Sequence, residues 1–228
     1  MMKDLRAFAY PTVSPSLLAS DHSQILAEIE KAQKAGAEFV HIDVMDGKFV
    51  PATSFGAAFV GDIAKKHPLV NDVHIMIEKP WLFVDSFAQA GADVLTFHYE
   101  ACRNQEERLR TIEEIHAAHV SAGLSIKPLT PASLLLPFLS SVELILVMSV
   151  EPGKGGQLFM PSALDKIAYL RKKIDALPGD KRPLIEVDGG INEITGPECL
   201  KAGADILVAG SYLYGHADFA LRLRKLLA

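Results

Sequence analysis

Cysteine is scarce in this chain of 228 residues, and the little there is forms no motif. Cys102 and Cys199 lie far apart in the sequence and form no Cys-x-x-Cys pair. Residues 1–10 contain Lys3, Asp4 and Arg6 and lack the apolar core of a secretory signal. Both absences predict a reducing, cytoplasmic compartment and argue against a disulfide scaffold.

Clusters of basic residues and long apolar runs are also missing. The chain has 23 Lys and Arg against 28 Asp and Glu, a formal net charge of -5. That balance argues against nucleic acid or an anionic membrane as a partner, although a local pocket for one small anion stays open. No window approaches the ~20 apolar residues that a membrane-spanning helix needs.

The composition that is present is typical of a globular protein. Hydrophobic residues make up 49% of the chain and charged residues 22%. No linker or low-complexity segment divides the sequence. We therefore expect one domain over residues 1–228, a usual length for an α/β barrel.

Strand and helix signals alternate along the whole chain. Apolar runs predict eight strands, near residues 13–18, 39–44, 71–77, 93–98, 123–127, 143–149, 184–188 and 205–209. Four of them follow a glycine that is expected to end a helix in the left-handed conformation, at Ala35-Gly36-Ala37, Ala90-Gly91-Ala92, Ala122-Gly123-Leu124 and Ala202-Gly203-Ala204. Proline after Thr130 and after Met160 marks two further helix starts. Eight alternating units predict a closed (β/α)8 TIM barrel.

Histidine and aspartate recur near the ends of three of these strands. His41 and Asp43 are two residues apart in one strand and therefore share a face. His74 lies in the third strand, and Asp188 ends the seventh. Functional groups of a TIM barrel gather at the carboxyl ends of its strands. Two imidazoles and two carboxylates there predict a site for a divalent transition metal, and the carboxylates could also move protons.

Methionines and glycines complete the expected pocket. Met45, Met76 and Met148 occur at matching strand ends, where they form either a pocket wall or core filler. Glycines concentrate after strands six, seven and eight, where backbone N–H groups can bind a phosphate. His98 is compatible with a structural role as well as with a ligand. Asp46 faces away from the site and is expected to order the loop that follows it.

Five motifs together resemble the ribulose-phosphate 3-epimerase family, and the resemblance extends over nearly the whole chain. They are Ser14-Pro15-Ser16-Leu17-Leu18-Ala19, His41-Ile42-Asp43-Val44-Met45-Asp46-Gly47-x-Phe49-Val50-Pro51, Asp72-Val73-His74-Ile75-Met76, Val150-x-Pro152-Gly153-x-Gly155-Gly156-Gln157 and Glu186-Val187-Asp188-Gly189-Gly190-Ile191.

The resemblance implies a TIM barrel with one catalytic divalent metal, commonly zinc or iron, with manganese and cobalt as alternatives. It implies His41, Asp43, His74 and Asp188 as metal ligands, and Asp43 and Asp188 as the acid/base pair. It implies a substrate contact from Ser14. It also implies a phosphate cradle of Gly155, Gly156, Gly189, Gly190, Gly210 and Ser211. From their strand-end positions, Met45, Met76 and Met148 are expected to line the substrate pocket.

The chain departs from the usual family pattern at Glu151 and Lys154, where Asn and Phe are usual, and at Ala52, where Asn is usual. Lys154 could contact phosphate or pair with Glu151 on the surface. These positions leave two substrates open for the expected 3-epimerisation, D-ribulose 5-phosphate and a ketohexose 6-phosphate such as D-allulose 6-phosphate.

A non-catalytic sugar-phosphate-binding barrel is the third hypothesis, disfavoured because no expected ligand or acid/base residue is missing. Related phosphate barrels that decarboxylate or condense sugars use an Asp-x-Lys-x-x-Asp cluster after the third strand. This chain has Asp72-Val73-His74 there, which argues against that chemistry. We expect a cytoplasmic homo-oligomer that serves carbohydrate metabolism in the pentose phosphate pathway.

Overall fold

Eight parallel strands form the centre of the computed structural model, which describes residues 2–179 and 182–228. The sheet order is β1-β8-β7-β6-β5-β4-β3-β2. A parallel bridge between Ser16 and His41 joins its two edges and closes the barrel. The strands are β1 (Thr12–Pro15), β2 (Phe39–Met45), β3 (Val70–Met76), β4 (Val94–His98), β5 (Ser121–Ile126), β6 (Leu144–Met148), β7 (Leu184–Asp188) and β8 (Ile206–Ala209). The predicted TIM barrel is confirmed.

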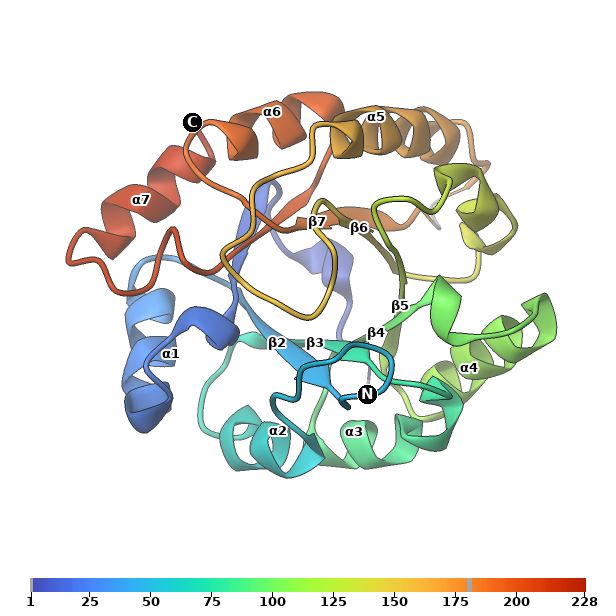
Figure 1. Ribbon diagram of the computed structural model, residues 1–228, viewed down its shortest axis with the longest axis horizontal. Coiled ribbons are helices and arrows are strands. Elements are labelled where there is room, and N and C mark those ends of the chain that lie inside the picture. Colours follow the sequence, from blue (N-terminus) through green and yellow to red (C-terminus); the bar gives the residue numbers. More distant parts are fainter. Residues whose placement is uncertain (1, 180–181) are drawn as a thin grey trace.

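Helices surround this barrel (Figure 1). The α-helices are α1 (Ile25–Lys34), α2 (Ala57–Ala64), α3 (Val84–Ala90), α4 (Gln105–Ala117), α5 (Ser162–Asp175), α6 (Thr195–Ala202) and α7 (Phe219–Leu226). Between β5 and β6 the connection is a 3-10 helix, Ala132–Phe138, that contains Pro137. Within the described ranges, no helix has the length and apolar character needed to cross a membrane.

Side chains alternate between the inside and the outside of the barrel. In β2, Val40, Ile42 and Val44 pack outward with the main core under the helices, whereas Phe39 belongs to a second, interior cluster. All seven residues of β2 are buried, as expected for a strand covered on both faces. The residues that share the parity of Phe39 therefore point into the barrel, and these include His41 and Asp43.

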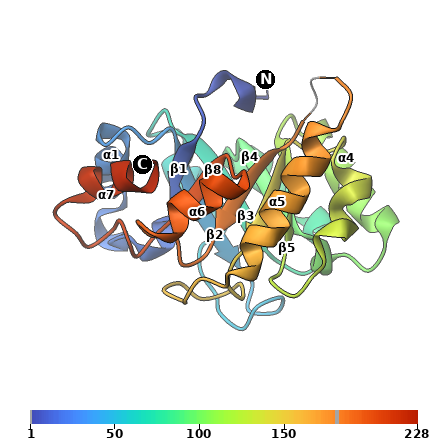
Figure 2. The ribbon, with the colours of Figure 1, turned by 90° about the horizontal axis from the view of Figure 1, so that it is seen from above.

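The two ends of the barrel differ. Leu5, Phe8 and Tyr10 pack on Phe39 and Val70, at the beginnings of β2 and β3, and so close the amino end of the barrel. Figure 2 shows the N-terminal segment at that end and the long loops after β2 and β6 at the opposite end. The carboxyl ends of the strands are left to form a cavity.

Local predictions were wrong at three places. Gly123 lies inside β5, and the left-handed residue after α4 is His119, with φ 60°. A Cβ on Gly123 would lie 2.0 Å from Thr96 Oγ1, so glycine is required there for close strand packing. The first strand ends at Pro15, because Leu17–Ala19 already form a 3-10 helix. Pro131 precedes a 3-10 helix in place of an α-helix.

Candidate active site

Four side chains from three strands converge at the carboxyl end of the barrel. His41 and Asp43 come from β2, His74 from β3 and Asp188 from β7. Each offers one ligand atom, and these atoms all lie within 4.8 Å of one another. His41 and His74 are fully buried and Asp43 is 4% exposed. The structure thus brings together the four residues that the resemblance implied as metal ligands.

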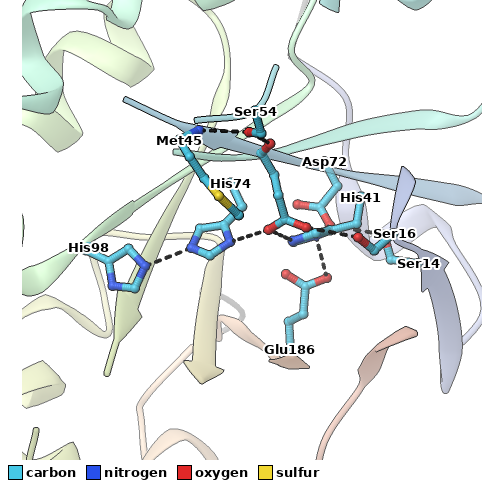
Figure 3. Close-up of polar contacts among 10 residues, drawn as sticks. Ser14, Ser16, His41, Met45, Ser54, Asp72, His74, His98 and Glu186 are labelled. Atoms are coloured by element: carbon cyan, nitrogen blue, oxygen red, sulfur yellow. Dashed lines mark hydrogen bonds and ion pairs between the residues drawn. The ribbon is translucent and has the colours of Figure 1, made fainter. Parts of the chain in front are cut away.

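The ring of His41 is held by a carboxylate deeper in the barrel (Figure 3). Its Nδ1 lies 2.6 Å from Asp72 Oδ2, which also accepts a hydrogen bond from Ser14 Oγ at 3.0 Å. A proton on Nδ1 leaves a lone pair on Nε2. That Nε2 has no hydrogen-bond partner and lies 3.3 Å from Asp43 Oδ1.

The two ring nitrogens of His74 contact two different side chains, Asp43 and His98. His74 Nδ1 lies 3.0 Å from Asp43 Oδ1, while its Nε2 lies 2.9 Å from His98 Nε2. Ser16 Oγ donates to the other carboxylate oxygen of Asp43 at 2.9 Å. Both imidazoles therefore turn a ring nitrogen toward the same carboxylate oxygen.

Burial and nearby charges shift the pKa values of the two carboxyl groups of the site in opposite directions. For Asp43 burial would raise the pKa, but the charge of His41 and the hydrogen bond with His74 outweigh burial and lower it. Burial, reinforced by the charge of Asp43, raises the pKa of Asp188 to about 7. Burial lowers the pKa of His74.

This donor set fits a divalent transition metal. Imidazole nitrogens and carboxylate oxygens are the ligands that zinc and iron accept in proteins. Carboxylate oxygens and unprotonated ring nitrogens are all acceptors, so their convergence in a buried site requires a shared cation or added protons. The unpartnered Nε2 of His41 is the clearest sign of that requirement.

A cavity of about 380 Å³ opens above the cluster. Its walls include Ser16, Asp43 and Asp188, and three methionines form an apolar side: Met45, Met76 and Met148. The residues proposed from the sequence for a phosphate cradle line the same cavity: Gly155, Gly156, Gly189, Gly190, Gly210 and Ser211. The cavity therefore combines an apolar wall, carboxylates and exposed backbone.

The glycines after β7 are required by the backbone itself. Gly190 has φ +64°, and a Cβ there would lie 2.5 Å from the amide nitrogen of Phe159 in the β6 loop. Gly189 has φ +118°, and its Cβ would lie 2.5 Å from a methyl group of Val150. The β6 and β7 loops can approach each other only because side chains are absent at these two positions.

Ser14 does not belong to the cavity wall. It is fully buried and donates to Asp72, whereas Ser16 lines the cavity. The structure therefore gives no support to the substrate contact implied for Ser14, and Ser16 is the serine placed for it. Both residues share an inward parity, so the sequence alone did not distinguish them.

Asp46 and His98 lie near the site but outside the proposed ligand set. Asp46 accepts hydrogen bonds from the backbone N–H groups of Lys48 and Phe49, each at 2.8 Å, and from Glu78 N–H at 2.9 Å. It therefore orders the β2 loop, as expected. His98 is fully buried against His74 and belongs to neither of the possible metal clusters in the described chain.

Two buried carboxyl groups of the site, Asp72 and Glu186, were not expected from the sequence. Both are fully buried, and Glu186 Oε1 lies 4.0 Å from His41 Nδ1. Burial and then the charge of Asp72 raise the pKa of Glu186 well above its usual range. Each residue lies two positions before a proposed ligand, Asp72 before His74 and Glu186 before Asp188. That shared parity was the available signal.

Glu151 and Lys154 both line the cavity mouth and are exposed. No ion pair joins them in the part of the chain that the structure describes. The surface pair considered from the sequence is therefore not observed. Lys154 is the one lysine or arginine among the residues that line this cavity in the described chain.

Solved structures similar to this chain share its fold at low sequence identity. A 3-keto-L-gulonate-6-phosphate decarboxylase from Vibrio cholerae aligns with a TM-score of 0.70 at 12% identity and covers 96% of each chain. A 3-hexulose-6-phosphate synthase from Salmonella typhimurium aligns with a TM-score of 0.69 at 16% identity, over 94% of this chain and 96% of the other. These likenesses establish the barrel and say nothing about substrate.

Proteins with higher sequence identity to this chain share one name. A ribulose-phosphate 3-epimerase from Bacillus subtilis is 43% identical over 206 residues, which are 90% of this chain and 93% of that protein. The cytoplasmic isoform of the enzyme from rice is 39% identical over 217 residues, or 94% of this chain and 92% of that protein. The model of the ribulose-phosphate 3-epimerase family matches residues 12–214. With this cavity, this cluster and these relatives, the chain belongs to the ribulose-phosphate 3-epimerase family.

Proposed function

We propose that this chain is an isomerase that inverts C3 of a ketose phosphate and interconverts D-ribulose 5-phosphate and D-xylulose 5-phosphate. The observation that carries the proposal is the convergence of four acceptor side chains within 4.8 Å beneath a cavity lined by glycines. The membership of the chain in the family supports the choice of substrate.

His41, Asp43, His74 and Asp188 would hold one divalent metal, Zn²⁺ or Fe²⁺, with Mn²⁺ or Co²⁺ as alternatives. When bound, the metal supplies Lewis-acid stabilisation of negative charge that develops on the substrate oxygens. The Asp72 carboxylate keeps a proton on His41 Nδ1 and so directs Nε2 to the site.

Asp43 and Asp188 are the proposed acid/base pair. Epimerisation beside a ketone removes a weakly acidic C3 proton, leaves a planar enediolate and returns a proton to the opposite face. The two aspartates belong to β2 and β7, three positions apart around the closed barrel. They can therefore flank a flat intermediate from two sides.

The cavity walls supply binding. Backbone N–H groups at Gly155, Gly156, Gly189, Gly190 and Gly210, with Ser211, are proposed to bind the phosphate. The three methionines would keep water away from the enediolate, since their thioethers form an apolar, polarizable surface. Ser16 replaces Ser14 as the proposed serine contact.

The other substrates and roles considered from the sequence gain no support. The curated relatives described above carry the pentulose phosphate name, so the ketohexose 6-phosphate alternative is not favoured. The proposed ligand and acid/base side chains converge, so a barrel that only binds sugar phosphate is not favoured either.

The whole chain, residues 1–228, is proposed to be one catalytic domain that works as a cytoplasmic homo-oligomer in the pentose phosphate pathway. Both cysteines are free and buried, in keeping with a reducing compartment. Size-exclusion chromatography with light scattering tests the oligomer, and cell fractionation tests the location.

A coupled assay tests the function. Purified protein of measured metal content is assayed on D-ribulose 5-phosphate and, in parallel, on D-allulose 6-phosphate. We expect a higher kcat/KM on the pentulose phosphate. A higher value on the hexulose phosphate would reverse the substrate assignment, and no turnover of either sugar by metal-loaded protein would leave a binding barrel.

A further inference from the structure

A line of polar side chains leads from His74 away from the proposed metal position. His74 Nε2 lies 2.9 Å from His98 Nε2, and both rings are fully buried. On the other side of His98, its Nδ1 lies 3.4 Å from Glu100 Oε2. The three residues come from two adjacent strands, β3 and β4, and from the turn that follows β4.

The position of the protons in this line follows from its two ends. Two ring nitrogens at 2.9 Å form a hydrogen bond only if one carries a proton and the other does not. Glu100 Oε1 accepts hydrogen bonds from Lys127 N–H and from the Thr130 hydroxyl, as an ionised carboxylate does. Burial would raise the pKa of Glu100, but His98 and these hydrogen bonds outweigh it and lower the pKa to about 2.

The contact between His98 Nδ1 and Glu100 Oε2 is not a hydrogen bond, but the negative charge of Glu100 at 3.4 Å stabilises the His98 tautomer with its proton on Nδ1. His98 Nε2 is then an acceptor, so the proton between the two rings belongs to His74 Nε2. Asp43 Oδ1, 3.0 Å from His74 Nδ1, would accept a proton from that nitrogen in the absence of a metal. With a cation shared by the two residues, Nδ1 keeps its lone pair and the His74 proton lies on Nε2.

We infer that His98 and Glu100 are positioning residues that hold His74 in the tautomer whose Nδ1 binds the metal. This inference rests on the proposed metal site and extends it beyond the four ligands. It also gives His98 the structural role that the sequence left open, because His98 acts through His74 and lies outside both possible clusters in the described residues.

The side chains around His98 bury it, so water does not reach His74 Nε2 to accept its hydrogen bond in place of His98. The ring of Phe49 packs on His98 with centroids 4.9 Å apart, and the ammonium of Lys127 lies 4.2 Å from the centre of the Phe49 ring. The β2 loop thus covers the histidine pair. If His98 is removed, the Nε2–H of His74 loses its acceptor in a buried place, where an unpaired donor is costly.

Four variants test the inference through zinc affinity, measured by chelator competition on metal-free protein. His98→Leu removes the acceptor and should weaken zinc binding about 10- to 100-fold, the usual effect of losing such a partner. His98→Gln places an amide oxygen near the former Nε2 and should restore most of the affinity. Glu100→Gln removes the charge that fixes the proton and should weaken binding about 10-fold. His116→Gln, at a half-buried histidine paired with Glu143, should bind zinc as the wild type does.

Nitrogen NMR of the zinc-loaded wild type provides a second readout, because ring ¹⁵N shifts distinguish protonated from unprotonated nitrogens. We expect His98 to be protonated at Nδ1 and unprotonated at Nε2. Thermal unfolding checks that each variant folds, and Glu100→Gln carries the affinity test if His98→Leu does not.

The outcomes separate the two proposals. Wild-type zinc affinity in folded His98→Leu or in Glu100→Gln, or a proton on His98 Nε2, would overturn the positioning role alone. A wild-type protein that binds no divalent transition metal would overturn the proposed site as well.

Discussion

Two aspartates with the same side chain have different environments in this site. Asp43 accepts a hydrogen bond from Ser16 and faces two histidines, and its pKa is lowered. For Asp188, burial and then the charge of Asp43 raise the pKa to about 7. Groups whose pKa values are pushed apart in this way are suited to opposite roles in proton transfer. In the metal-free protein Asp43 is ionised, whereas Asp188 holds a proton below pH 7.

Metal affinity should therefore depend on pH through Asp188. The carboxyl group must lose its proton to bind a cation, so affinity should rise as the pH increases through the pKa of Asp188 at about 7. Calorimetry at pH 6 in buffers of different ionisation enthalpy should detect a proton released from Asp188 on zinc binding. Asp188→Asn should not release this proton on zinc binding. Equal proton release by the wild type and the variant would remove Asp188 from the linkage.

Asparagine at either aspartate should abolish proton transfer while preserving size. General acid–base groups contribute about 10²–10⁴-fold each, so Asp43→Asn and Asp188→Asn should each lose at least 10²-fold in kcat. Because each residue serves one face, one variant should still exchange the C3 proton of the substrate with deuterium from solvent. Nuclear magnetic resonance follows that exchange. Near-normal epimerisation by a folded, metal-loaded variant would exclude that residue from the mechanism.

At the scale of elements, strand register builds the site in layers. Pairing of β2 with β3 places His41 beside Asp72, Asp43 beside His74, and Met45 beside Met76. Moving toward the carboxyl ends, the interior thus passes from a ligand with its supporting carboxylate, to two further ligands, and then to an apolar wall. A shift of one residue in either strand would turn the three inward side chains of that strand outward.

The β6 loop carries two of the three departures of this chain from its family pattern, Glu151 and Lys154. Lys154 lines a cavity whose other charged residues in the described chain are Asp43, Glu151 and Asp188, so its ammonium offsets their repulsion of a phosphate. Lys154→Met should raise KM for the phosphorylated substrate several-fold with little change in kcat. Steady-state kinetics at two salt concentrations measures this. Lys172→Met, on the exposed face of α5, is the control, and an unchanged KM in Lys154→Met would place the lysine outside recognition.

Glycines in the loops after β6 and β7 allow a graded test of the phosphate cradle. A Cβ on Gly155 would have only Leu18 Cδ2 nearby, at 3.9 Å, so Gly155→Ala should fold normally and raise KM by occupying space beside the backbone. Gly190→Val should raise KM and also lower stability, because its Cβ meets Phe159 N. Kinetics with thermal unfolding separates the effects. Equal kcat/KM for ribulose and ribulose 5-phosphate in the wild type would refute the cradle.

At the scale of the whole molecule, barrel closure joins residues that are far apart in sequence. The seam between β1 and β2 is short, and it includes the bridge from Ser16 to His41. That seam brings Asp188 on β7 to within ligand distance of Asp43 on β2. The converging acceptors are costly inside the barrel without a cation.

Metal removal should therefore affect both activity and stability. A chelator should abolish turnover, and a divalent transition ion should restore it. A ligand at 100 times its Kd stabilises the folded state by about 2.7 kcal/mol, which for a chain of this size should raise the Tm by roughly 5–10 °C. Differential scanning calorimetry measures the shift. Full activity in protein shown to contain no metal would refute the metal assignment.

The sequence by itself determined the barrel and the main members of the site. Parallel strands buried on both faces are continuous apolar runs, so a polar residue within one stands out, and two-residue periodicity assigns it to a face. His41, Asp43, His74 and Asp188 could be found in this way.

Tertiary structure decided which polar groups support the ligands and which reach the cavity. Ser14 and Ser16 share a parity, but they lie at different depths along the barrel. Ser14 therefore donates a hydrogen bond to Asp72, whereas Ser16 donates one to Asp43. The roles of Asp72 and His98 depend on hydrogen bonds between different strands. Likewise, Gly123 serves the approach of β5 to Thr96 on β4. Such contacts join residues distant in sequence, and local periodicity carries no information about them.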